Sequence, residues 1–397
     1  MKLSALIFAA ALAGCATSSL PATERIDGEA LDARIEALMA REQVVGMAVA
    51  IVDHGEITHV GAYGLRNREN ALPLQTDTIM YGASVTKAAF SYMVMQLVDE
   101  GKIDLDRSIA DYLPRPLPEL EDYTDLAGDE RWRQLTPRIL LTHRSGLANM
   151  RFLEPDQKLR FHFTPGEHYA YSNEGIWILQ IVLQEGLGLD VGAEMQRRVF
   201  DRFGMTRTSM QWRDDFAGNL ADGYAMDGTF EPHDRRDNVA AAGSMDTTIT
   251  DQARMWRGMF AGEGLSRRAR AEWVSAQFPI RTRQKFPTIQ FFNTVDTRGE
   301  ASDLSASLVG ETWNGPNDRY FSKGGHNDWT GNLVICAERQ QRCLIVFGNS
   351  VRAEVIFPEI AELVLGETDF PFWWTNRLRQ NRPATPLFRE NPLEARA

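Results

Sequence analysis

Features that would point to a metal, a nucleic acid or a membrane-spanning domain are scarce in this chain of 397 residues. Its 7 histidines are scattered and no H-E-x-x-H motif occurs, so we predict no metal site, and we expect no cofactor. The formal net charge of -11 leaves no concentrated basic surface for phosphates, which argues against a nucleic-acid partner. The mixed-charge cluster at residues 233–237 is typical of a solvated loop rather than a site.

Long apolar runs are also missing, apart from one at the start of the chain. Lys2 supplies a positive charge, and residues 3–13 form an uncharged apolar run that is too short to span a bilayer. The sequence L-A-G-C at residues 12–15 resembles a bacterial lipobox, in which the cysteine becomes the lipidated first residue of the mature protein. Plain secretion is the alternative, because A-L-A at residues 11–13 also fits an A-x-A cleavage site.

We therefore expect a signal peptide with a lipobox over residues 1–15 and a polar tether over residues 16–29. The mature protein is expected on the periplasmic side of a bacterial membrane. Its only membrane attachment would be the lipid on Cys15.

Cysteine is scarce too, with 3 residues in the chain including Cys15. Cys336 and Cys343 flank a polar turn between two apolar, strand-like runs. An oxidising compartment would allow a disulfide across the two strands, whereas two buried thiols are the alternative. Either arrangement would have a structural role.

The pattern of apolar residues predicts strands at both ends of the chain and helices between them, which is an α+β fold. The predicted strands cover residues 45–52, 57–63, 319–323, 331–337 and 342–348. The predicted helices begin at Ser84 and near residues 137, 174, 190, 251 and 353, with an irregular stretch from about 261 to 318. We predict one domain over residues 30–368, with a sheet part at 30–83 and 240–368 and a helical part at 84–239. A loosely ordered tail is expected over residues 369–397.

Ser84 and Lys87 form an S-x-x-K motif at the start of an apolar helix. The two residues lie on one face of such a helix, and its amino end favours a developing oxyanion. A serine N-cap followed by a surface lysine is the alternative. The neighbours of Lys87 are almost all apolar, which favours a buried lysine with a chemical role.

Two later segments carry further polar residues beside apolar ones. Tyr171-Ser172-Asn173 follows a turn at residues 164–167 and precedes an apolar helix start. Lys323-Gly324-Gly325 closes a predicted strand, and its glycines would let a backbone approach a substrate closely. Each segment alone is a weak indication of a site.

Taken in order, S-x-x-K, Y-x-N and K-x-G make the chain resemble the β-lactamase-related serine hydrolases. This group contains class C β-lactamases, D-alanyl-D-alanine carboxypeptidases and family VIII esterases. L-L-T-H-R-S-G-L at residues 140–147 and A-G-S-M at residues 242–245 also resemble segments of the family. The resemblance covers roughly residues 30–350, and it implies an antiparallel sheet built from both chain ends with the site between sheet and helices.

The resemblance implies that Ser84 is the nucleophile and that Lys87 and Tyr171 are catalytic with it, although which of the two is the base stays open. A lysine serves as base only if burial or a neighbouring cation lowers its pKa. Lys323 would provide such a cation, and both lysines together would favour a Tyr171 phenolate.

The resemblance also implies the residues that bind the substrate. The backbone N–H groups of Ser84 and His326, the latter following Gly325, would form the oxyanion hole. Asn173 would hold a substrate amide and the Lys87 ammonium, and Lys323 would recognise a substrate carboxylate.

The expected activity is hydrolysis through an acyl-enzyme, with an ester, a β-lactam or a D-Ala-type peptide amide as substrate. The partner would thus be a small molecule or a peptidoglycan-derived one, and the oligomeric state is left open. The alternative function is a module that binds a cell-wall peptide or penicillin without turnover. We expect His143 to be a buried structural histidine, and the bulky residues 326–330 to narrow the pocket.

Overall fold

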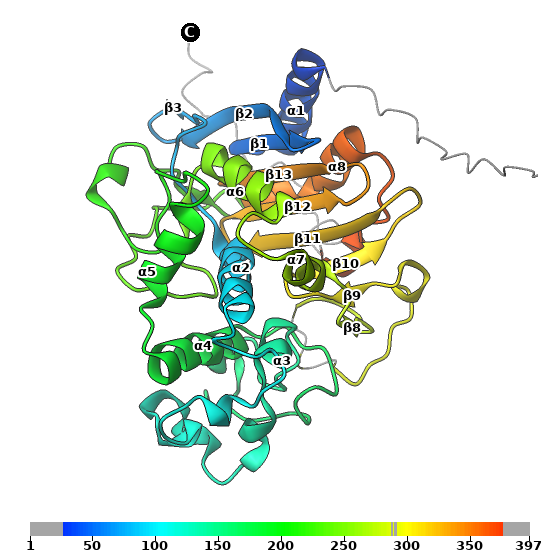
Figure 1. Cartoon of the computed structure of the whole chain (residues 1–397). Helices are drawn as coiled ribbons and strands as arrows, with labels where there is room; N and C mark the ends of the chain where they lie inside the picture. The colour runs from blue at the N-terminus through cyan, green and yellow to red at the C-terminus, as the bar shows by residue number, and fades with distance from the viewer. Residues whose placement is uncertain (1–26, 287–288, 290–291, 376–397) are drawn as a thin grey trace, which may run out of the picture.

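A computed structural model describes residues 27–375 except 287, 288, 290 and 291. Its centre is a 9-stranded antiparallel sheet in the order β3-β2-β1-β13-β12-β11-β10-β9-β8 (Figure 1). The sheet joins both ends of the described chain, because β1 pairs with β13 along its whole length. The strands are β1 (Gly46–Asp53), β2 (Glu56–Asn67), β3 (Leu72–Pro73), β8 (Phe278–Pro279), β9 (Ser305–Ala306), β10 (Glu311–Asn314), β11 (Arg319–His326), β12 (Gly331–Ala337) and β13 (Arg342–Gly348).

The sheet divides the hydrophobic core into two layers, because successive side chains of a strand point to opposite faces of the sheet. Met47 and Val49 of β1 face the layer that contains α1 (Gly28–Glu42) and α8 (Phe357–Leu365). Ala48 of β1 faces the opposite layer, with helices packed against the sheet (Figure 1). These helices are α2 (Thr86–Asp99), α6 (Ile249–Ala261) and α7 (Arg267–Val274).

The helical part of the chain extends from α2 and lies beside the sheet (Figure 1). It contains α3 (Pro137–Leu141), α4 (Asn173–Ile181) with a π-turn at Val182–Gly186, and α5 (Val191–Met195) with a π-turn at Gln196–Phe200. Side-chain caps start several helices: the Thr136 hydroxyl accepts from Ile139 N and the Ser172 hydroxyl from Gly175 N. Two small sheets complete the fold, β4 (Met80–Tyr81) with β7 (Asp246–Thr247) and β5 (Gly223–Tyr224) with β6 (Phe230–Glu231).

The predicted α+β fold, with strands from both chain ends and helices between, is confirmed. The stretch from 261 to 318, predicted as irregular, instead contains α7, β8, β9 and β10. Strands of two residues are too short to show a period, and the charged sequence of α7 hides its apolar face. The helix predicted from Ser84 begins at Thr86, because Ala83–Val85 form a 3-10 turn.

The predicted boundaries at the chain ends need correction. α1 begins at Gly28, so the predicted tether cannot extend to residue 29. The predicted tail is wrong for residues 369–375, because Phe370 and Trp374 are buried and α9 covers Phe372–Thr375. The signal peptide, the tether up to residue 26 and the tail from residue 376 lie outside the described residues.

In the described part of the chain, no single helix is long and apolar enough to cross a membrane. One pair of segments, Asn173–Gly186 and Val191–Phe200, passes that test together and is bent by 103°.

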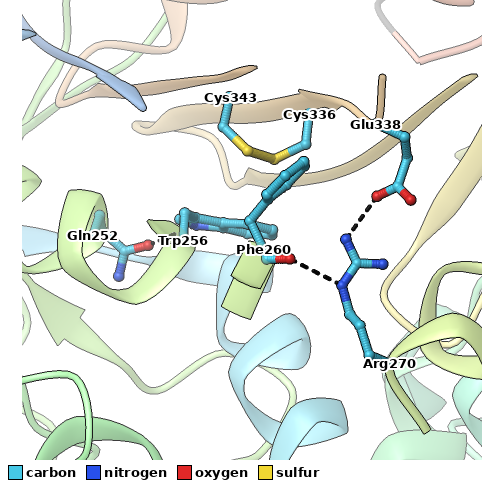
Figure 2. Close-up of a disulfide and its surroundings, with 7 residues drawn as sticks. All are labelled: Gln252, Trp256, Phe260, Arg270, Cys336, Glu338 and Cys343. Carbon is cyan, nitrogen blue, oxygen red and sulfur yellow. Dashed lines mark hydrogen bonds and ion pairs between the residues drawn. A yellow bond between two sulfur atoms is a disulfide. The ribbon is translucent and has the colours of Figure 1, made fainter. Parts of the chain in front are cut away.

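The two cysteines at the sheet centre form a disulfide, which decides between the two alternatives left open by the sequence. Cys336 of β12 lies directly opposite Cys343 of β13, and their sulfurs are 2.02 Å apart. Figure 2 shows the bridge next to Trp256 and Phe260 of α6. Arg270 of α7 donates to the Phe260 carbonyl at 3.1 Å and to Glu338 at 2.7 Å, so this region ties two helices to the sheet.

We predict that reducing this disulfide lowers the free energy of unfolding by about 2–3 kcal/mol, because a bridge that closes a short loop restricts the unfolded chain. Urea unfolding with and without reductant measures the difference. The double variant Cys336→Ala, Cys343→Ala is the control and should show no effect of reductant. Two reactive thiols at these positions in the unreduced, denatured protein would contradict the disulfide.

Candidate active site

Ser84 lies in a strained turn between β4 and α2. Ala83, just before it, has a φ of 45°, a left-handed conformation that residues other than glycine rarely adopt. Two hydrogen bonds hold this turn: Gly82 N donates to the Met245 carbonyl at 2.8 Å, and the Thr86 hydroxyl donates to the Ala83 carbonyl at 2.6 Å. The turn presents the Ser84 hydroxyl beside the first turn of the helix.

The structure brings the predicted S-x-x-K and Y-x-N motifs together at this hydroxyl. Nζ of Lys87 donates to Ser84 Oγ at 2.9 Å, and Oη of Tyr171 donates to the same atom at 3.0 Å. Lys87 is only 3% exposed, and its Nζ also donates to the Ala242 carbonyl at 2.6 Å. Ser84 therefore has two proton-transfer groups within hydrogen-bond distance.

Burial determines the protonation state of Lys87. Desolvation, and then the positive charges of Lys323 and Lys285, hold the pKa of the Lys87 amine well below its usual range. Both causes expected from the sequence, burial and a neighbouring cation, are thus present. A neutral amine beside Ser84 can accept the hydroxyl proton.

Aromatic packing holds Tyr171 in place. The His143 ring stacks on the Tyr171 ring with centroids 4.0 Å apart, and Phe286 packs edge-on at 4.7 Å. His143 is 4% exposed, and Ser172 N donates to its Nδ1 at 3.3 Å. The predicted burial and hydrogen bonding of His143 are confirmed, and its ring also packs against the tyrosine.

The expected Tyr171 phenolate is not favoured. Burial raises the pKa of Tyr171, the Glu311 carboxylate acts in the same direction, and the hydrogen bond to Ser84 only partly opposes them. The neighbouring lysines do not overcome the cost of burying a phenolate. Burial thus favours the protonated form of Tyr171 and the neutral form of Lys87.

A buried ion pair that sequence reasoning missed lies next to Tyr171. Nζ of Lys285 is 2.6 Å from Glu311 Oε1, and the two side chains are 8% and 3% exposed. Glu311 begins β10, whereas Lys285 lies in the segment after β8. Neither residue belongs to a motif, so only their position beside the nucleophile identifies them.

Lys323 lies in β11 near this pair and is 1% exposed. Its ammonium is 5.2 Å from the centre of the Tyr171 ring. Burial lowers the pKa of Lys323 to about 7, with Glu311 opposing this shift and Lys285 adding to it. Lys323 thus titrates near neutrality.

The glycine after Lys323-Gly324 lets β11 approach the nucleophile turn. A Cβ on Gly325 would lie 2.7 Å from the Gly82 carbonyl oxygen and 3.2 Å from Ser84 N. This close approach, between Gly325 and the nucleophile's own backbone, is separate from the approach to a substrate that the sequence predicts. It places the start of His326 beside Ser84, where the two N–H groups were predicted to form an oxyanion hole.

The His326 side chain forms a second charged pair at the site. Its Nδ1 lies 2.7 Å from Glu354 Oε1. Desolvation lowers the pKa of His326, but the Glu354 carboxylate outweighs it and raises the pKa above its usual value. Glu354 belongs to no motif in the sequence and comes from the 3-10 turn Val351–Val355 before α8.

Asn173 is placed near the site, but one of its predicted contacts is wrong. Its Oδ1 is buried and has no hydrogen-bond partner among the described residues. Lys87 was expected to bind this oxygen and instead donates to the Ala242 carbonyl, which the turn at residues 241–243 brings within 2.6 Å. Asn173 lines a cavity that also reaches Ser84.

Two cavities meet at Ser84 and His326, which line both. The first is rich in aromatic side chains and also contains Tyr171 and the Lys285–Glu311 pair. The second is lined by Met150, Asn173, Trp177, Asp234, Arg236 and Ala242, among others.

Two expectations change here. Within residues 326–330, Trp329 lines neither cavity and packs on Gly223, and only His326 and Asn327 are among the lining residues of the two cavities. Residues 233–237 are not simply a solvated loop, because Arg236 turns inward and pairs with Asp246 at 3.1 Å. Burial of Asp246 in β7 draws that arginine in.

Comparison with known proteins agrees with this geometry. A family model described as Beta-lactamase matches residues 31–366. Esterase EstB from Burkholderia gladioli is 29% identical over 220 residues, covering 48% of this chain and 54% of its own. A Beta-lactamase from Providencia stuartii is 26% identical over 214 residues, covering 51% of each chain.

The chain thus spans about half the length of these curated relatives. Among solved structures, the D-alanine carboxypeptidase AmpC from Burkholderia cenocepacia superposes with a TM-score of 0.66 at 20% identity, covering 85% of this chain and 98% of its own. That likeness shows a shared fold. Because the family model covers most of the sequence, the chain belongs to the Beta-lactamase family.

Proposed function

We propose that this chain is a serine hydrolase that forms an acyl-enzyme on Ser84 and cleaves an ester, a β-lactam or a D-Ala-type peptide amide. The observation that carries the proposal is the pair of hydrogen bonds on Ser84 Oγ, from Lys87 at 2.9 Å and from Tyr171 at 3.0 Å. Membership of a family with esterase and β-lactamase relatives supports the same chemistry.

Acylation begins when neutral Lys87 takes the Ser84 proton and Oγ attacks the substrate carbonyl carbon. The carbonyl oxygen gains negative charge, which the N–H groups of Ser84 and His326 stabilise. Tyr171 donates its proton to the leaving atom as the carbonyl bond to that atom breaks, and the proton on Lys87 restores the phenol. The leaving group departs protonated, and Ser84 carries the acyl group.

Deacylation repeats these steps with water. The water loses a proton to the Lys87–Tyr171 pair, attacks the acyl carbon and releases the acid, and Ser84 regains its proton. Asn173, whose side-chain oxygen has no partner among the described residues, would hold an N–H group of the substrate.

The second candidate is a module that is acylated, or merely binds a cell-wall peptide, without turnover. A catalyst releases more than one product per protein, whereas such a module stops at one. The neutral base beside the nucleophile favours the enzyme.

We predict that Ser84→Ala abolishes hydrolysis of every substrate while the protein remains folded. Mass spectrometry after treatment with a slow-turnover acylating agent should place the adduct on Ser84. Circular dichroism of the variant controls for folding. An adduct on another serine would rule out this nucleophile.

We further predict that the two lysines of the motifs differ in effect. Lys87→Ala should slow every substrate by about two to four powers of ten, since it removes the general base. Lys323→Ala should slow carboxylated substrates by about one to two powers of ten and neutral esters much less, because it removes a charge-assisted hydrogen bond. The measurement is kcat/KM for each variant on one carboxylated and one neutral substrate.

Lys102→Ala, at an exposed position beyond the end of α2, is the matched control and should leave kcat/KM on both substrates unchanged.

The pH dependence of kcat/KM offers a second check. Lys323 is charged below its pKa of about 7, so preference for the carboxylated substrate should be present below that pH and decline above it. Equal slowing of both substrates by Lys323→Ala would assign Lys323 to proton transfer instead.

We also propose that the protein is exported and anchored by lipid on Cys15. The disulfide between Cys336 and Cys343 supports an oxidising compartment, since such bonds are rare in the cytosol.

When the full chain is expressed in a bacterium, Cys15 should incorporate labelled fatty acid and the protein should fractionate with membranes. Cys15→Ala should remove the label and release the protein. Labelling that survives this substitution, or a wild-type protein found wholly in the soluble fraction, would refute the anchor.

A further inference from the structure

The cavity on the Tyr171 side of Ser84 has an unusually apolar wall. Besides Tyr171 and His326, six of its lining side chains are aromatic or aliphatic, and they come from four separate parts of the chain. They are Phe286, Leu333, Phe357, Phe370, Phe372 and Trp374. Small-molecule sites are typically concave and apolar with a few polar groups at the reacting end, which is how this cavity is arranged around Ser84.

The segment at residues 370–375 is firmly anchored where it forms this wall. The Phe370 ring packs on Trp313 at 5.1 Å and on Phe372 at 4.5 Å. Trp374 is 1% exposed, and its Nε1 donates to the Thr282 hydroxyl at 3.1 Å. Trp373, between them in sequence, lies over the Arg298 guanidinium at 4.0 Å and does not line the cavity.

The charged residues of the cavity occur in opposite pairs. Lys285 contacts Glu311 at 2.6 Å, and His326 contacts Glu354 at 2.7 Å. Lys323, the proposed partner of a substrate carboxylate, is not among the lining residues. The interior therefore suits an uncharged group, because an added charge would lose its hydration beside aromatic walls.

The position of Tyr171 indicates which half of the substrate enters. A group that protonates the leaving atom must lie next to that atom. Tyr171 lines the aromatic cavity, whereas Asn173 lines the other cavity. The leaving group thus lies in the aromatic cavity, and the acyl group lies on the Asn173 side.

We propose that the aromatic cavity is a leaving-group pocket that selects substrates with a bulky, apolar and uncharged leaving group, such as esters of arylalkyl alcohols. This inference rests on the proposed acyl-enzyme at Ser84. In that step the ester C–O bond breaks, the bond from Ser84 Oγ to the acyl carbon forms, and the serine proton ends on the departing alcohol. The segment at residues 370–375 acts as a specificity element.

The test varies the alcohol while the acyl group is constant. Wild-type protein should hydrolyse benzyl acetate with a kcat/KM at least about tenfold above that for ethyl acetate. Phe372→Ala and Phe286→Ala, on two different walls, should each reduce this ratio by about tenfold. Trp373→Ala is the matched control and should leave the ratio unchanged. The preference between 4-nitrophenyl acetate and 4-nitrophenyl butyrate should be the same in all four proteins.

Several outcomes would overturn the pocket. They are an unchanged ratio of kcat/KM for benzyl acetate over ethyl acetate in both cavity variants, an equal fall of this ratio in Trp373→Ala, or a change in acyl preference instead of alcohol preference.

Saturation-transfer NMR with benzyl alcohol on the inactive Ser84→Ala protein measures binding without turnover. Binding that Phe372→Ala weakens supports the pocket, and binding that it leaves unchanged overturns it. Absence of Ser84-dependent turnover with every ester, β-lactam and D-Ala-type peptide would overturn the proposed function separately.

Discussion

The burial of Lys87 beside Ser84 is the constraint on which the site depends. A lysine exposed to water is protonated at neutral pH and cannot accept a proton. Here the apolar surface of α2 and the neighbouring positive charges remove that proton, and the Ala242 carbonyl positions the amine. Burying this polar side chain costs free energy. The packing of the surrounding layers has to offset that free energy.

The charges around Lys87 are arranged in a consistent way. Glu311 lies close enough to Lys285 and Lys323 that they hold its pKa below the usual value despite its burial. Burial raises the pKa of Tyr171 and this carboxylate adds to the shift, whereas burial and the charges of Lys323 and Lys285 lower the pKa of Lys87. Burial and the local charges thus separate a proton acceptor from a proton donor that share the Ser84 hydroxyl. Such a separation suits a reaction that needs both within one catalytic cycle.

The sheet supplies the geometry for this chemistry. Strand β11 carries Lys323 and Gly325 past the nucleophile turn, and the absence of a side chain at Gly325 lets the two backbones meet. The neighbouring strands β12 and β13 are joined by the disulfide and backed by α6. A rigid strand next to a strained turn is a suitable frame for two N–H groups that must point at one oxygen.

The α+β arrangement, the helix after Ser84 and the three motifs could be predicted from the sequence, because they depend on local periodicity and on short spacings along the chain. A spacing of three residues places Ser84 and Lys87 on the same face of a helical segment, whatever the rest of the fold. Other features required the tertiary structure: the bond from Lys87 to Ala242 in place of Asn173, the Lys285–Glu311 pair, and the aromatic wall built by Phe370, Phe372 and Trp374. These contacts join segments that are far apart in the sequence. Local sequence patterns cannot predict them, because the packing of the sheet decides which distant side chains come into contact.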